Sequence, residues 1–200
     1  MKKRNIWVIC AAAALAVTTG LGVAISAQAG SDDVAVGEVA SILFSPADAA
    51  DALPVFLTEG GQAHSQLSPE TARSLGSLAG SQYWIAQSTG GDVCLVVLVS
   101  GPDQLASSTC VPAKVAVDSG LTLQVQSAAT GITERLYLIP DGYIATISGS
   151  LSKVSDQLVV GVTNSSAAID VPVVRPAEGA KGSTPVEFRS YPIEPLLESK

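Results

Sequence analysis

The chain has 200 residues, of which 11 are Lys or Arg and 18 are Asp or Glu, so its formal net charge is −7. Only 14% of the residues are charged and 47% are hydrophobic. Disordered chains combine low hydrophobicity with high net charge, and nucleic-acid-binding proteins usually carry a basic surface. The composition therefore argues against both classes and favours a globular protein without a nucleic-acid partner.

The first 29 residues have the organisation of an export signal. Residues 2–4 are basic, and residues 5–28 carry no charge. An apolar stretch follows, and Ala27-Gln28-Ala29 supplies the small residues that a signal peptidase needs, which predicts cleavage between Ala29 and Gly30. The alternative is an uncleaved membrane anchor, because the apolar segment is long enough for a transmembrane helix. In either case we expect the rest of the chain to be extracytoplasmic, secreted or anchored to the cell membrane only through this N-terminal segment.

Two helices are predicted in the first part of the exported chain. Residues 30–66 are rich in Ala, Asp and Gly and predict a loosely structured segment, in which Ser45-Pro46 would begin a short helix over residues 49–52. A firmer helix is predicted from Ser68, with Pro69 in its first turn and Gly80 at its end.

The remainder of the chain predicts strands. Residues 82–88 and 93–99 flank a Gly-Gly turn, which is typical of a hairpin, and the second run is apolar on both faces, as in a central strand. Residues 112–118 predict a short helix that ends at Gly120. Further strands are expected at residues 121–126, 132–139, 143–148, 157–163 and 168–174.

These elements predict an α+β fold with a mainly antiparallel sheet of about seven strands and one or two short helices packed on it. We expect this domain to span residues 67–174. Residues 175–200 contain four prolines and predict a tail that follows the surface or is disordered.

Two cysteines remain beyond the signal, Cys94 and Cys110. An even number in an exported chain predicts a disulfide, which would close a loop of 110 − 94 = 16 residues and contribute about 3 kcal/mol to stability. Free thiols are the alternative. A zinc site is not expected, because zinc needs three or four ligands and the single histidine, His64, lies in a glycine-rich linker. No metal or other cofactor is predicted.

Two features suggest alternative functions. Ser150 and Lys153 have the Ser-x-x-Lys spacing of some serine hydrolases, but the companion motifs are missing and the segment has the pattern of a turn. No catalytic residue is therefore assigned. The second feature is the loop from Ser100 to Thr109, which a disulfide would constrain and which an inhibitor or accessory protein could present to a partner.

Aromatic residues make up only 4% of the chain, so few platforms for sugar rings are available. Tyr83 and Trp84 are the main candidates, and strand alternation sends their side chains to opposite faces. Packing in the core is the favoured interpretation, and exposure of one of the two rings is the alternative. Pro140-Asp141-Gly142 predicts a turn rather than a ligand loop.

The order of these features carries a resemblance to a known group of proteins. A strand at residues 83–86 is followed by a Gly-Gly-Asp turn, Val93-Cys94-Leu95, then Ser108-Thr109-Cys110, and finally Pro140-Asp141-Gly142. This order resembles uncharacterised extracytoplasmic proteins of actinobacteria that have a β-rich domain with paired cysteines. The resemblance implies an envelope location and no known activity. We therefore expect a non-enzymatic module of a bacterial cell envelope that acts by binding or assembly with an unknown protein or envelope partner.

Overall fold

The computed structural model describes residues 36–59, 66–102, 105–164, 169–178, 186 and 188. All of them belong to one compact unit, Asp32–Lys200. The predicted signal or anchor, its Ala29–Gly30 cleavage site and His64 lie outside the described residues. Within the described part, no helix has the length and apolar character needed to span a membrane.

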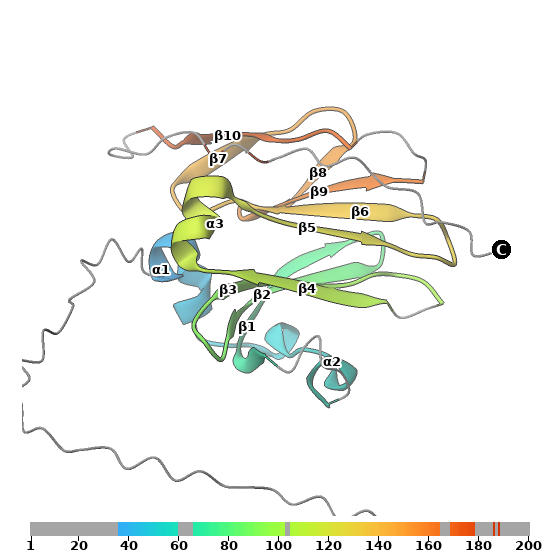
Figure 1. Ribbon diagram of the computed structural model, residues 1–200, viewed down its shortest axis with the longest axis horizontal. Coiled ribbons are helices and arrows are strands. Elements are labelled where there is room, and N and C mark those ends of the chain that lie inside the picture. Colours follow the sequence, from blue (N-terminus) through green and yellow to red (C-terminus); the bar gives the residue numbers. More distant parts are fainter. Residues whose placement is uncertain are drawn as a thin grey trace, which may run out of the picture. The chain divides into compact units, whose positions relative to one another are not determined.

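The protein is built mainly of antiparallel strands, as predicted, but its described residues form ten strands rather than about seven. Two four-stranded sheets have the orders β1-β2-β3-β4 and β5-β6-β9-β8, and β10 and β7 form a third, smaller sheet. Figure 1 shows the three sheets as successive layers, with the large β5-β6-β9-β8 sheet in the middle. The strands are β1 (Leu67–Leu78), β2 (Ser81–Ser88), β3 (Val93–Leu98), β4 (Ala106–Val111), β5 (Leu121–Gln126), β6 (Thr133–Leu138), β7 (Tyr143–Thr146), β8 (Leu151–Ser155), β9 (Leu158–Thr163) and β10 (Val173–Pro176).

Short helices flank the sheets. Helix α3 follows β4 and leads into β5, and it ends at Gly120, whose φ of 71° suits a glycine at a helix end. This helix was predicted. The helical elements are α1 (Val36–Val39), η1 (Ser41–Phe44), η2 (Ala49–Asp51), α2 (Val55–Glu59) and α3 (Ala113–Ser119).

Apolar side chains fill both spaces between the three layers. The largest cluster lies between the two four-stranded sheets and includes Ile85, Leu95 and Leu136. A second cluster, with Tyr137 and Val159, lies between the middle sheet and the β7–β10 pair. The third covers the outer face of the β1–β4 sheet, where Trp84 packs against Leu53 and Leu57 of the N-terminal segment. Strand β3 is buried on both faces except at its last residue, as its sequence predicted.

The helix predicted from Ser68 to Gly80 is wrong, because this segment is strand β1. Its register with β2 shifts twice, between Ser68 and Arg73 and between Ser74 and Gly76. Such bulges change which face a residue occupies, so the apolar residues of the strand recur at a spacing that imitates a helix. Pro69 is tolerated because β1 is the edge strand of its sheet.

Gly80 belongs to a hairpin turn and ends no helix. Leu78 pairs with Ser81, so only Ala79 and Gly80 connect β1 to β2. Both have positive φ, 51° at Ala79 and 90° at Gly80, as a type I′ turn requires. Ala79 is the only non-glycine residue of the described part with positive φ.

Residues 36–59, the described part of the N-terminal segment that was expected to be loose, contain four short helices and contribute to the core. Val39, Ala40 and Leu43 are buried in the main core, so residues 36–44 are part of the domain. The short helix expected over residues 49–52 is η2, but Asp48 caps it, not Ser45. The capping box of Asp48 and Asp51 explains this choice, because each side chain accepts a hydrogen bond from the other end of the turn.

One buried arginine fastens this segment to β1. Both Nε and Nη2 of Arg73 donate to the carbonyl oxygen of Ser45, at 2.9 and 2.6 Å. Asp51 lies 3.9 Å from the same guanidinium, and its other oxygen accepts from the backbone N–H of Ser74 at 2.7 Å. These contacts hold residues 45–51 against the edge of the sheet.

Besides β1, two further strands were not predicted, and the last strand was misplaced. Strand β4 was expected as a loop and β8 as a turn. The strand expected at residues 168–174 begins only at Val173 and pairs with β7. The predicted tail contacts the domain at two described residues. Val186 pairs with Val174 in an isolated β-bridge. The ring of Phe188 packs edge-on against the ring of Tyr137, with 5.1 Å between the ring centroids.

Candidate functional site

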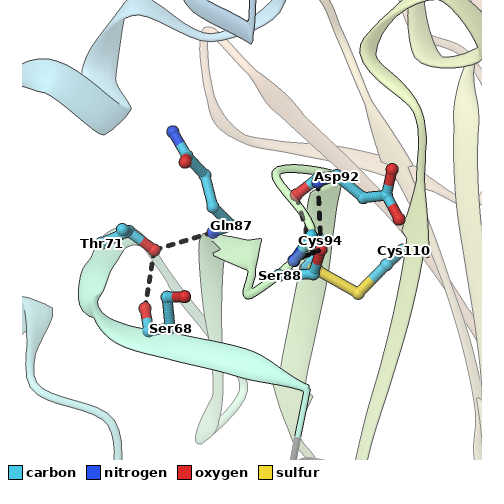
Figure 2. Close-up of a disulfide and its surroundings, with 8 residues drawn as sticks. Ser68, Thr71, Gln87, Ser88, Asp92, Cys94 and Cys110 are labelled. Atoms are coloured by element: carbon cyan, nitrogen blue, oxygen red, sulfur yellow. Dashed lines mark hydrogen bonds between the residues drawn. A yellow bond between two sulfur atoms is a disulfide. The ribbon is translucent and has the colours of Figure 1, made fainter.

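The predicted disulfide joins Cys94 in β3 to Cys110 in β4. The two residues are direct partners in the strand ladder, and their sulfur atoms are 2.05 Å apart. Figure 2 shows the bond crossing from the inner strand to the edge strand of the sheet. Cys94 is fully buried, whereas Cys110 is partly exposed. The bond therefore fastens an edge strand to the most buried strand of the sheet.

The turn beside the disulfide is held by hydrogen bonds to Ser88. Its hydroxyl accepts from the backbone N–H groups of Gly90 and Asp92, at 3.1 and 3.0 Å. On the neighbouring strands, the Thr71 hydroxyl donates to the carbonyl oxygen of Ser68 and accepts from the N–H of Gln87 (Figure 2). These bonds satisfy backbone groups, so the side chains at this end of the hairpin stabilise the turn and the neighbouring strands.

The loop expected from Ser100 to Thr109 is shorter than predicted. Strand β4 begins at Ala106, which pairs with Leu98, so the connection covers only residues 99–105, of which 103 and 104 lie outside the described residues. The disulfide is at the opposite end of this hairpin. The strand ladder, and not the disulfide, fixes the base of the loop.

Ser150 and Lys153 each contact a different carboxylate. The hydroxyl of Ser150 lies 3.3 Å from Oδ2 of Asp170. The ammonium of Lys153, in β8, lies 2.7 Å from Oδ1 of Asp156 and lowers the pKa of that carboxyl through its hydrogen bond and its charge. Each member of the predicted pair thus has a partner of its own.

Tyr83 and Trp84 are both buried, which agrees with the favoured expectation of core packing and excludes the alternative that one of them is exposed. They point to opposite faces of β2, but the N-terminal segment covers the outer face as well. The phenol of Tyr83 donates to Oε2 of Glu134 at 3.0 Å, and the hydroxyl of Ser81 donates to Oε1 at 2.6 Å. Burial and the nearby Glu134 raise the pKa of Tyr83.

Residues Pro140-Asp141-Gly142 form the predicted turn, with φ of 77° at Gly142. Asp141 has a further role that the sequence did not indicate. Its carboxylate accepts from the backbone N–H of Ser41 at 2.6 Å and from the side-chain amide of Gln157. A polar cavity of about 400 Å³ lies beside it, lined also by Ser45, Ser74 and Asp156. Because both oxygens of Asp141 are already bonded, this side chain holds the cavity walls together.

A second cavity, of about 360 Å³, lies on the outer face of the β1–β4 sheet; we call it the Trp84 pocket. The indole N–H of Trp84 donates to the carbonyl oxygen of Ala50 at 3.3 Å and so ties the sheet to the N-terminal segment. No described lining residue is charged. The lining is formed by Ala49, Ala50, Ala52 and Pro54 on one side and by Ser74, Gly76, Ser77, Gln82 and Trp84 on the other.

Within the described ranges, no three His, Cys, Asp or Glu side chains come together as a metal site. No family model, curated protein or solved structure matches this chain. The resemblance to actinobacterial extracytoplasmic proteins stays a prediction.

Proposed function

We propose that this protein is a non-catalytic extracytoplasmic module of a bacterial cell envelope that acts by binding or by assembly. The observation that carries the proposal is the Cys94–Cys110 disulfide, built into the strand ladder beside a fully buried residue. Disulfides of this kind persist in oxidising compartments and are rare in the cytoplasm. The export signal predicted over residues 1–29 supports the same location.

The polar groups of the described residues support binding over catalysis. Ser150 and Lys153 are engaged with Asp170 and Asp156. Glu134 is 5% exposed, and both of its carboxylate oxygens accept hydrogen bonds inside the protein. A general base must reach the proton that it removes, and this carboxylate is covered.

The proposal is tested by isolating the protein from cells with a cross-linker applied to the intact envelope. We expect it in the envelope or medium fraction, with either an N-terminus at Gly30 or an intact N-terminal segment, and with a reproducible cross-linked partner. Recovery from the cytoplasm would contradict the location.

The claim that the protein is non-catalytic is tested separately with a fluorophosphonate, a reagent that labels activated serines. We expect no labelling of the native protein. Labelling that disappears in Ser150→Ala and Lys153→Ala but persists in the neighbouring Ser152→Ala would contradict the proposal and establish the serine hydrolase alternative.

A further inference from the structure

We propose that the Trp84 pocket binds the ring of a neutral sugar. This inference rests on the proposed binding function and gives it a site and a ligand class. The pocket lies between β1, β2 and the N-terminal segment of the described domain.

The first argument is the charge of the pocket. Its described lining carries no ionised side chain, although Arg73 and Asp51 lie next to lining residues in the sequence. Both charges are already engaged, because Arg73 donates to the carbonyl oxygen of Ser45 and Asp51 accepts from backbone N–H groups. A charged ligand would lose its hydration without gaining a counter-charge, so an uncharged ligand is favoured.

The second argument is that the lining combines apolar and polar residues. Ala49, Ala50, Ala52, Pro54 and Trp84 are apolar lining residues, while Gln82 and Ser77 are exposed polar residues at the pocket. An amide and a hydroxyl each offer both a donor and an acceptor. A pyranose ring has a matching combination, with C–H groups on its face and hydroxyl groups around its rim.

The third argument is that the walls are fixed before a ligand arrives. Trp84 is 4% exposed and bonded to Ala50, and the backbone of Ser74 is bonded to Asp51 across the same seam. A preformed site loses little conformational entropy on binding. The volume of about 360 Å³ is near the lower end of the roughly 300–1,000 Å³ range of small-molecule sites, so the pocket suits a single ring, free or at the end of a glycan.

The test uses the full chain with Trp7→Phe, so that Trp84 is the only indole whether or not the N-terminal segment is retained. Tryptophan emission is followed while methyl α-glucoside, methyl α-mannoside, methyl β-galactoside or N-acetylglucosamine is added. We expect a saturable change with at least one of these sugars and weaker binding of the charged sugars glucuronic acid and glucosamine.

Two variants and one control locate the site. Gln82→Ala removes a rim hydrogen bond and should weaken binding by about fivefold. Ala52→Phe fills the pocket from an exposed position and should abolish binding. Gln87→Ala is the matched control, because Gln87 lies on the same strand but does not line the pocket, and its binding should equal that of the parent.

Several results would overturn the inference. These are the absence of a saturable change with all four neutral sugars, unchanged binding in Ala52→Phe, or tighter binding of the charged sugars. Such a failure would leave the location and the cross-linked partner unaffected, so it is distinguishable from a failure of the proposed function. Recovery from the cytoplasm, in turn, would contradict the proposed function even if the sugar bound.

Discussion

Tyr83 on one sheet donates its phenolic hydrogen to Glu134 on the facing sheet, over 3.0 Å and inside the main core. The bond joins β2 to β6 through two residues that are 51 positions apart in the chain. Buried polar groups are costly when they lose their partners, so this pair and Ser81 constrain how the two sheets pack.

We expect Tyr83→Phe to lower the free energy of unfolding by about 1 kcal/mol, because it removes one donor and keeps the ring. Glu134→Ala should cost more, about 3 kcal/mol, because it leaves the donors of Tyr83 and Ser81 without their acceptor and opens a cavity. Urea unfolding of the oxidised protein measures both values. Equal and negligible effects would show that the contact contributes nothing to the packing of the sheets.

Tyr83 should also make stability depend on pH at the alkaline end. Burial, followed by the charge of Glu134, raises the pKa of its phenol above the ordinary value of 10.0. The folded state therefore favours the protonated phenol, and this contribution is complete below pH 10 and is lost as the pH rises beyond it. Between about pH 9 and about pH 11, the free energy of unfolding should fall less in Tyr83→Phe than in the parent. Some loss should remain in the variant, because the pKa of buried Tyr137 is raised as well.

In the turn between β1 and β2, we expect one substitution to lower stability and another to raise it. Gly80→Ala would place a methyl group 2.7 Å from the hydroxyl of Ser100 at a φ of 90°, so we expect a loss of about 1–2 kcal/mol. Ala79→Asn should raise stability by up to about 1 kcal/mol, because asparagine tolerates positive φ better than alanine. Thermal unfolding compares the two variants. A stabilising Gly80→Ala would contradict the turn, and also the strand assignment of β1.

A substitution at Gly120 tests whether Phe188 packs against this residue. A methyl group at this residue would lie 2.2 Å from the ring of Phe188, at a φ of 71°. We expect Gly120→Ala to destabilise the protein by more than the roughly 1 kcal/mol that the backbone conformation alone costs. The loss should be smaller when Phe188→Ala is already present, since the clash is then absent. Identical losses in both backgrounds would mean that Phe188 does not pack on this glycine.

The parts of the fold that the sequence predicted are those with local signals. The hairpin of β2 and β3 follows from two β-rich runs around a Gly-Gly turn, and α3 from its proline start and Gly120 end. Strand β1 was mistaken for a helix because its bulges change the spacing of its apolar residues. Strand β4 was missed because it is a partly exposed edge strand of small and polar residues without clear alternation.

The candidate sites were less predictable than the fold. The disulfide was predictable from the even number of cysteines beyond the predicted export signal. The Trp84 pocket was not, because its walls meet only when residues 49–54 fold onto the outer face of β1 and β2. Glu134 stands within a predicted strand, yet its partners Ser81 and Tyr83 come from the other sheet, and sequence periodicity carries no information about such contacts.

The central claim, an oxidised extracytoplasmic module, is tested most directly by counting free thiols in protein taken from cells without reductant. The protein is denatured, alkylated and cut with trypsin, which leaves Cys94 and Cys110 in one peptide, residues 74–114. We expect this peptide to carry no alkyl group until a reductant is added, and two afterwards. Two alkyl groups without reductant would contradict the account, because the cysteines would then be free in the cell.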